Sequence, residues 1–407
     1  MPDYDFYRRL GSPRYIVAPM VDHSDLPFRM QTRKHGAQLV FTQMMNANVL
    51  IQCREYRDEL LQSCEGDRPL IVQLCGDNPT TLLQAARMVQ DTCDAIDLNL
   101  GCPQGIAKRG HYGAFLMEEL PLLSSIVSTL VKNCSVPITC KTRIYKNDFQ
   151  RSIRLCETLV AAGASMLTIH GRSREEKGHA IQAADWDMIA RIKAHFMSRG
   201  IRIPIVANGS IARLEDVVRC VEITAVDGVM TSEAVLENPA LFEDSSTINS
   251  CVYESTNTGR SNSSDGSSSS MRQLDLAQEY LDLCRVYHPP GNSMRIIRSH
   301  MMKFMHRYFV CHDDLRNRAA MARSMDDFQC MLDEARRMVG PEEGYSQSWY
   351  GRHMHPTHSY AGRGNPEALS KLKQSQFERS LYSSCNNDEE GDDCEDVDIL
   401  GGLFGDE

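Results

Sequence analysis

The sequence lacks several features that would place it in common functional classes. It contains no C-x-x-C pair and no Cys/His quartet with the spacing of a zinc site, so we expect no resident metal. No apolar run approaches the ~20 residues that cross a bilayer, so we expect no membrane-spanning helix. The N-terminus, Met1–Asp5, carries no basic-then-apolar signal, and the 15 cysteines are an odd number. We therefore expect a reduced intracellular protein, cytoplasmic, nuclear or both.

An excess of basic charge is also missing, because the formal net charge is −10. Ten acidic residues lie from Asp388 onward, in a stretch without Lys or Arg. Without these ten, the chain has 44 acidic residues against 44 Lys and Arg. A neutral body can still present a basic face, so the net charge does not exclude a nucleic-acid partner.

Short apolar, β-branched segments do recur up to about residue 232, with helix-like stretches between them. The strand candidates are Tyr15–Pro19, Leu39–Gln43, Leu70–Leu74, Ala95–Leu100, Ile138–Thr142, Met166–His170, Ile203–Asn208 and Gly228–Ser232. Eight βα units in a row, with strands buried on both faces, predict a (β/α)8 TIM barrel, an α/β fold. A doubly wound open sheet is the alternative. We favour the barrel because the number and spacing of strands fit it, and no G-x-G-x-x-G follows the first strand.

Composition divides the chain into four parts. Residues 1–243 hold the predicted barrel, and 244–271 are rich in Ser, Asn and Gly, which predicts a flexible insert. Helical periodicity returns from Leu274 to about Val339, broken at His288–Gly291, and predicts a C-terminal helical domain over 272–340. The remainder, 341–407, is polar and acidic from 388, and we expect it to be disordered.

Polar residues stand where most of the predicted strands end. They are Gln73, Asn99, Lys141, Arg143, His170 and Asn208. Functional groups of a barrel gather at the C-terminal ends of its strands, so these side chains should converge at one mouth. Each alone has a structural explanation, such as a salt-bridged lysine or a hydrogen-bonded histidine. Together they favour a functional site, because each polar group buried without a partner costs about 1–3 kcal/mol.

Two segments after the fourth strand carry a resemblance to a known family. Asp97–Gln104 (DLNLGCPQ), followed by Ala107–Ala114 (AKRGHYGA), resembles the signature of the dihydrouridine synthases, and the second segment resembles the eukaryotic branch that modifies D-loop uridines 16 and 17 of tRNA. The likeness runs from Ala18 to Phe242 and more weakly through the helical domain. Gly105 stands where a bulky apolar residue is expected, and Ser210 where that branch usually has Asn. The resemblance implies an oxidoreductase acting on a CH–CH group, with FMN in the barrel, NADPH or NADH as electron donor, and tRNA as substrate.

The resemblance also implies roles for the matching residues. Cofactor contacts are expected at Pro19, Met20, Val21, Gln73, Lys141, His170, Asn208, Gly209, Ser210, Ser232 and Glu233. Lys141 would place a cation near the flavin ring, and the residues after the seventh and eighth strands would offer backbone N–H groups to the phosphate. The uracil is expected at Asn99, Arg143 and Arg172. FMN would give hydride to C6, and Cys102 would protonate C5 as a neutral thiol, since cysteine has an ordinary pKa of about 8.5.

The helical domain is rich in basic residues. Arg295, Ser299, Lys303 and Arg307 step by four and should share one helix face. A solvated amphipathic helix explains this pattern as well. Beside the barrel motifs, we predict that Arg295, Arg298, Lys303 and Arg307 bind the tRNA backbone.

The sequence leaves two other functions open. A flavin barrel that reduces a free pyrimidine or another small enone would need no basic helical domain. A non-catalytic tRNA-binding homologue would keep the barrel without the flavin, although intact Asn99, Cys102 and Lys141 argue against it.

Overall fold

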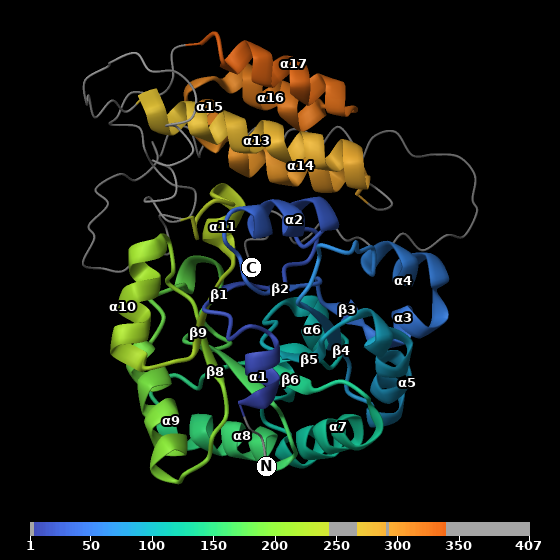
Figure 1. The fold of residues 1–407 in the computed structure, drawn as a ribbon, viewed down its shortest axis with the longest axis vertical. Helices are drawn as coiled ribbons and strands as arrows, with labels where there is room; N and C mark the ends of the chain where they lie inside the picture. Colours follow the sequence, from blue (N-terminus) through green and yellow to red (C-terminus); the bar gives the residue numbers. More distant parts are fainter. Residues whose placement is uncertain (1–3, 244–266, 290–292, 339–407) are drawn as a thin grey trace, which may run out of the picture.

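Parallel strands form a single sheet that curls into a barrel (Figure 1). The computed structural model describes residues 4–243, 267–289 and 293–338. The sheet order is β1-β9-β8-β7-β6-β5-β4-β2, with β3 pairing to β4. The strands are β1 (Tyr15–Val17), β2 (Val40–Phe41), β3 (Met45–Asn46), β4 (Leu70–Cys75), β5 (Ala95–Leu100), β6 (Ile138–Arg143), β7 (Met166–His170), β8 (Ile205–Asn208) and β9 (Gly228–Thr231).

The first and second strands bring the two edges of the sheet together. Ile16 and Leu39 form a parallel bridge, and the Val17 N–H donates to the Leu39 carbonyl at 3.0 Å. Each of the eight predicted segments overlaps one strand of this nearly closed ring, with β4 and β6 one residue longer than predicted. Strands β4, β5, β8 and β9 are buried at every residue. Burial on both faces is what continuous apolar strands require. The predicted (β/α)8 barrel is confirmed.

Apolar side chains fill one end of the barrel interior. The cluster consists of Ile16, Ala18, Leu39, Phe41, Ile71, Ala95, Met166, Val206 and Met230, together with Phe6, Tyr7 and Leu10. Phe6 and Tyr7 belong to α1 (Asp5–Arg9), and the Tyr7 hydroxyl donates to the Pro13 carbonyl at 2.5 Å, just before β1. Helix α1 therefore closes the N-terminal end of the barrel, which leaves the C-terminal end for a site.

Helices surround the barrel, as the predicted βα alternation requires. They are α2 (Leu26–Lys34), α3 (Ala47–Gln52), α4 (Arg54–Leu60), α5 (Pro79–Val89), α7 (Leu120–Asn133), α8 (Phe149–Ala161), α9 (Trp186–Ser198), α10 (Leu214–Thr224) and the short α11 (Glu233–Glu237). Asn78 caps α5 by accepting from the N–H groups of Thr80 and Thr81 at 2.9 and 3.0 Å, with Pro79 in the first turn. An asparagine cap followed by proline in the first turn is a common way for a helix to begin.

In the described residues after 243, five further helices follow the barrel. They are α13 (Ser267–Tyr287), α14 (Ser293–Phe304), α15 (His306–Cys311), α16 (Asp313–Met321) and α17 (Met325–Ala335). The interruption between α13 and α14 matches the predicted break at His288–Gly291. Helix α13 begins at Ser267, inside the segment 244–271 that composition assigned to an insert. The rest of that segment, and the predicted tail, lie outside the described residues.

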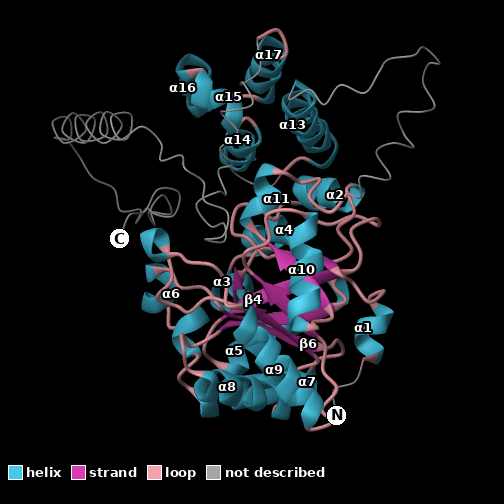
Figure 2. Ribbon diagram, turned by 90° about the vertical axis from the view of Figure 1, so that its left-hand side faces the viewer, coloured by secondary structure: helices cyan, strands magenta, loops and turns pink. Residues whose placement is uncertain are grey.

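The helical region stands on the barrel as a second layer. Figure 2 shows α13–α17 stacked above α2 and α11, and α13 packs along α2. The Gln31 side-chain amide donates to the Leu276 carbonyl at 2.7 Å, and buried residues of both parts belong to one apolar cluster. Because α2 follows β1 and α11 follows β9, the helical region contacts the barrel at its C-terminal end.

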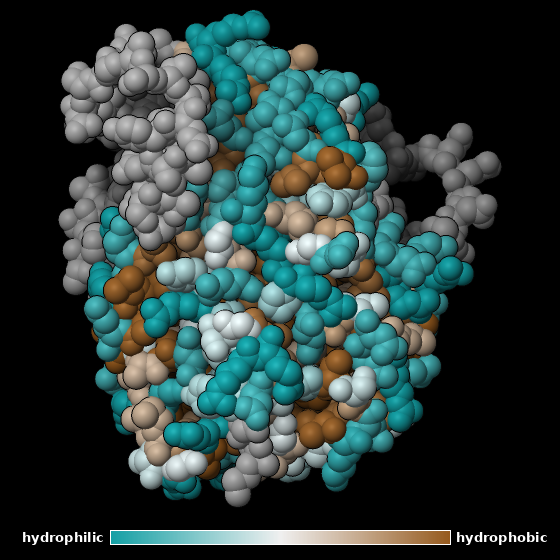
Figure 3. All heavy atoms as spheres, viewed as in Figure 1, coloured by the Kyte–Doolittle hydropathy of each residue, from teal (hydrophilic) through white to brown (hydrophobic). Residues whose placement is uncertain are grey.

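Apolar side chains are scattered over the outer surface. On the face drawn in Figure 3 they lie in separate patches among hydrophilic ones. Within the described residues, no helix combines the length and apolarity that spanning a membrane requires.

Candidate active site at the barrel mouth

Polar side chains occupy the barrel interior beyond the apolar cluster, in registers set by strand pairing. The register nearest the apolar end pairs Gln73, Asp97 and Thr139. The next pairs Asn99, Lys141 and Thr168, and the outermost pairs Arg143, His170 and Asn208. The predicted convergence of strand-end groups at the C-terminal mouth is therefore confirmed.

A hydrogen-bonded chain runs through the register nearest the apolar end. Asp97 accepts from the Thr139 hydroxyl at 2.6 Å and from the Gln73 amide at 2.8 Å, and the Gln73 oxygen accepts from the Asn99 amide at 2.8 Å. Burial raises the pKa of Asp97 to about 6 against these hydrogen bonds and the charge of Lys141. The chain fixes the Asn99 side chain, with its oxygen turned toward the loop that follows β5.

The side-chain oxygen of Asn99 fixes the conformation of the Gly-Cys-Pro turn. Asn99 Oδ1 accepts from the N–H groups of Gly101 at 3.2 Å and Cys102 at 3.0 Å. The Cys102 carbonyl in turn accepts from the Ala114 N–H at 3.0 Å. Burial raises the pKa of the Cys102 thiol, although Arg143 and Lys141 oppose the shift. Cys102 is thus a neutral, half-buried thiol held at a fixed point of the mouth.

Gly113 makes this turn sterically feasible. Its φ is +68°, and a Cβ at this position would lie 2.8 Å from the Cys102 carbonyl oxygen and 3.0 Å from the Cys102 Cβ. Only glycine combines this backbone conformation with so close an approach. The end of the segment Ala107–Ala114 therefore packs against the backbone of Cys102, through Gly113 and Ala114.

Two cations stand beside the thiol. Burial and the nearby Arg143 lower the pKa of Lys141 to about 8, and among the described residues the Lys141 ammonium has no hydrogen bond or ion pair. Arg143 donates to the carbonyl oxygens of Gly101 at 2.7 Å and Ser173 at 2.8 Å. Burial and the charge of Arg172 lower the pKa of Arg143 to about 10. Lys141 is thus poised for a ligand, and Arg143 is oriented by the backbone.

Arg172, His170 and the loop after β8 form a second cluster. The Arg172 guanidinium lies 3.2 Å from His170 Nε2 and donates to the Ser210 hydroxyl at 3.2 Å. Gly209 and Ser210 have φ of +106° and +59°, and among the described residues neither N–H donates to a backbone carbonyl. A Cβ on Gly209 would approach His170 to 2.9 Å. Successive N–H groups beside an arginine form a concavity suited to an anion.

The remaining predicted cofactor residues border the mouth on the side of β1 and β9. Pro19, Met20 and Val21 follow β1; the Met20 N–H donates to the Ser24 hydroxyl at 2.9 Å, and Val21 is 50% exposed. Ser232 and Glu233 follow β9, where Glu233 opens α11. Asn208 turns its amide to the Met230 carbonyl at 2.9 Å, so it braces β8 against β9.

Comparison with known proteins agrees with this geometry. A family model described as dihydrouridine synthase matches residues 16–338. The chain belongs to the dihydrouridine synthase family. It is 40% identical over 349 residues to a Mus musculus protein named tRNA-dihydrouridine(16/17) synthase (NAD(P)+)-like, covering 83% of this chain and 66% of that protein. It is 36% identical over 329 residues to the tRNA-dihydrouridine(16/17) synthase of Schizosaccharomyces pombe, covering 80% of this chain and 77% of that protein.

The four basic residues predicted to bind RNA lie at or near the boundary between the helical region and the barrel of this dihydrouridine synthase. Lys303 is 8% exposed, and its ammonium contacts His23 Nε2 at 2.7 Å. Lys303 is therefore an interior contact and not an exposed phosphate ligand. Arg307 lies on α15, which follows a break in the helix at Met305, so Arg295 and Arg307 belong to successive helices.

The other basic residues are partly exposed and already engaged. Arg295 pairs with Asp22 through both terminal nitrogens at 2.7 and 2.8 Å, and Arg298 donates to the Ala322 carbonyl at 2.5 Å. Arg307 lies 3.8 Å from Glu237. Their role in RNA binding stays a prediction.

Three residues important to the site were not singled out from the sequence. Gly113 and Asp97 lie inside the two segments that resemble the family signature, Ala107–Ala114 and Asp97–Gln104. His23 had no local signal, because its partners Ser299 and Lys303 lie far away in the sequence.

Proposed function

We propose that this chain reduces the C5=C6 bond of D-loop uridines 16 and 17 in tRNA, with FMN as cofactor and NADPH or NADH as electron donor. The observation that carries the proposal is the neutral Cys102 thiol, fixed by Asn99 and Gly113 beside Lys141 and Arg143. Membership of the dihydrouridine synthase family and the names of its relatives support the reaction and the tRNA substrate.

The residues present fit FMN. The concavity at Gly209 and Ser210, with Arg172 reaching Ser210, suits a phosphate. Lys141 offers its ammonium to the edge of the ring. We therefore assign Arg172, which the sequence placed with the uracil, to the phosphate side of the site together with His170.

The chain's own residues account for the specificity of the reaction. When bound, FMN would supply the hydride for C6 of the uracil, with NADPH or NADH as the source of the electrons. Arg143 keeps a terminal NH2 group for the uracil, because its hydrogen bonds to Gly101 and Ser173 use only Nε and Nη1. Cys102 gives its proton to C5, and its raised pKa keeps that proton available at neutral pH. The uridine must leave its stack to reach the mouth, which costs a few kcal/mol and favours loop nucleotides.

Reconstitution with defined substrates tests this proposal. We expect the purified protein to be yellow, to release FMN on denaturation, and to form dihydrouridine at positions 16 and 17 of an unmodified tRNA transcript when NADPH is supplied. Free uridine is the matched substrate control. Turnover of free uridine equal to that of tRNA would favour a small-molecule reductase, and a colourless protein that cannot bind FMN would contradict the enzyme assignment.

Replacing Lys141 with methionine should weaken FMN binding about tenfold, the usual cost of losing one charge-assisted hydrogen bond. The pKa of Lys141 is lowered to about 8, so its charge is present below that pH and lost as pH rises through it. FMN affinity of the wild-type protein should therefore decline above about pH 8, and that of Lys141→Met should not. Fluorescence titration of the apoprotein with FMN at several pH values measures both effects. Parallel pH profiles for the two proteins would remove Lys141 from the cofactor site.

A further inference from the structure

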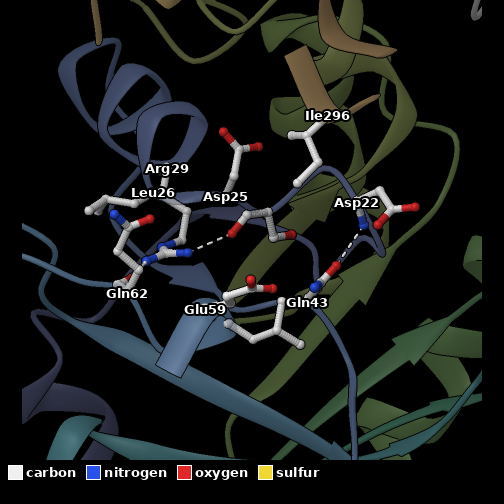
Figure 4. Close-up of a pocket in the computed structure, with 10 residues that line it drawn as sticks. Asp22, Asp25, Leu26, Arg29, Gln43, Glu59, Gln62 and Ile296 are labelled. Atoms are coloured by element: carbon white, nitrogen blue, oxygen red, sulfur yellow. Dashed lines mark hydrogen bonds between the residues drawn. The ribbon is translucent and has the colours of Figure 1, made fainter. Parts of the chain in front are cut away.

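The segment that follows β1, from Met20 to Asp25, contacts the helical region. It carries Met20 and Val21, and Figure 4 shows its residues Asp22 and Asp25 beside Ile296 of α14. On the barrel side, the Asp22 N–H donates to Gln43 Oε1 at 2.6 Å. Arg29 of α2 also donates to the Ser24 carbonyl at 2.5 Å. The side chains of Asp22, His23 and Asp25 reach out of the segment to α13 and α14.

A buried chain of hydrogen bonds links α14 to Val21. The Lys303 ammonium contacts His23 Nε2 at 2.7 Å and donates to the Ser299 hydroxyl at 3.0 Å. His23 Nδ1 lies 2.9 Å from the Val21 carbonyl oxygen. An ammonium can only donate, so His23 must present a lone pair at Nε2 and carry its proton on Nδ1, which then donates to Val21.

The charges around this chain favour that arrangement. Burial, followed by the charge of Lys303, holds the pKa of His23 well below its ordinary value, so the ring is neutral. Burial lowers the pKa of Lys303 to about 8, while the carboxylates of Glu233 and Asp22 oppose the shift. The Lys303 ammonium therefore faces charges from both segments that border the mouth, one after β1 and one after β9.

Contacts of Asp22 and Asp25 also fix the same segment to the helical region. Arg295 binds Asp22 through two nitrogens, and Asp25 contacts His300 Nε2 at 2.7 Å and accepts from the Tyr280 hydroxyl at 3.1 Å. The side chains of Asp22, His23 and Asp25 thus each contact a residue of α13 or α14. A bidentate pair and a buried network of this kind restrict the segment to one conformation.

We propose that Lys303 is a positioning residue of the cofactor site, which acts through His23 to fix Met20 and Val21 against the flavin. The helical region is then part of the cofactor site as well as a candidate platform for RNA. This inference rests on the proposed flavin function, because the flavin is expected along Pro19–Val21.

Lys303→Met keeps the aliphatic stem and removes the ammonium. We expect the FMN dissociation constant of the apoprotein to rise about tenfold, as for other residues that orient a ligand-binding group. Lys193→Met is the matched control, because Lys193 is 5% exposed and its ammonium binds Asp227 at 2.6 Å and the Tyr4 hydroxyl at 2.9 Å. Asp227 precedes β9, at the opposite end of the barrel. Lys193→Met should lower the melting temperature and leave FMN affinity unchanged.

The double variant Lys303→Met/His23→Leu separates positioning from stability. Replacing both polar partners with apolar groups is often close to neutral for folding, so the melting temperature should recover relative to Lys303→Met. If Lys303 positions the flavin segment, FMN affinity stays weak in the double variant. Recovery of FMN affinity together with stability, or wild-type affinity in Lys303→Met, would overturn the proposal. A wild-type protein that binds no FMN would overturn the proposed function and this inference with it, and that result requires no variant.

Discussion

Replacing Cys102 with alanine is expected to lower uridine reduction in tRNA by at least ~100-fold, the lower end of what a positioned general acid contributes. The backbone of residue 102 is held by the Asn99 side chain, which accepts from its N–H, and by the Ala114 N–H, which donates to its carbonyl. The alanine variant keeps these contacts, so the loop should keep its shape. FMN content and oxidation of NADPH should survive, because the proposed role of the thiol is only to protonate C5.

Cys134→Ala is the matched control for this variant. Cys134 is also a half-buried free thiol whose pKa is raised by burial, but it follows α7 at the N-terminal side of the barrel. A single-turnover assay of dihydrouridine per tRNA compares the two variants with the wild-type protein. Near-normal product formation by Cys102→Ala would show that another group supplies the proton.

Local patterns in the sequence were sufficient to predict the barrel and the cluster at its mouth. Each strand is a short apolar run whose period and length are visible locally, and parallel strands bring their ends together by geometry alone. Strand periodicity alone therefore places Gln73, Asn99, Lys141, Arg143 and His170 at one mouth, and the observed strand registers confirm it.

The positions of the arginines and of Lys303 could not be predicted in this way. A basic helix face has the same spacing whether it meets solvent, RNA or the acidic loops of another part of the chain. Lys303 is buried against His23, which lies 280 residues earlier in the sequence. Arg295 pairs with Asp22 across a similar separation. Contacts between such distant residues leave no local pattern in the sequence. Arg172 differs for another reason: the sequence places it at the mouth, but the direction of its side chain is set by its hydrogen bond to the Ser210 hydroxyl.

Gly113 explains why the residues around Cys102 form a unit larger than the Gly-Cys-Pro turn. A side chain at residue 113 would collide with the backbone of residue 102, which cannot rotate away as a flexible side chain can. The Tyr112 ring packs in the same small apolar cluster as Cys75 and Cys102, next to Gly113. The recognised segments before and after residue 105 therefore depend on each other sterically.

Gly113→Ala is accordingly expected to reduce uridine reduction about 100-fold, because a displacement on the order of 1 Å of a reacting group can have this effect. Two costs act at this position. A left-handed backbone costs an alanine roughly 1–2 kcal/mol, and the new Cβ must push the Cys102 carbonyl away from 2.8 Å.

Gly200→Ala isolates the first cost. Gly200 has a φ of +69°, close to the +68° of Gly113, and a Cβ there would meet no atom within 4 Å. Both variants should lose a similar backbone contribution to their melting temperature, and both should retain FMN. Only Gly113→Ala should lose uridine reduction in single-turnover assays, since only its Cβ displaces the proton donor. If Gly113→Ala reacts as fast as Gly200→Ala, the loop has absorbed the methyl group without moving Cys102, and the exact placement of the thiol matters less than the geometry indicates.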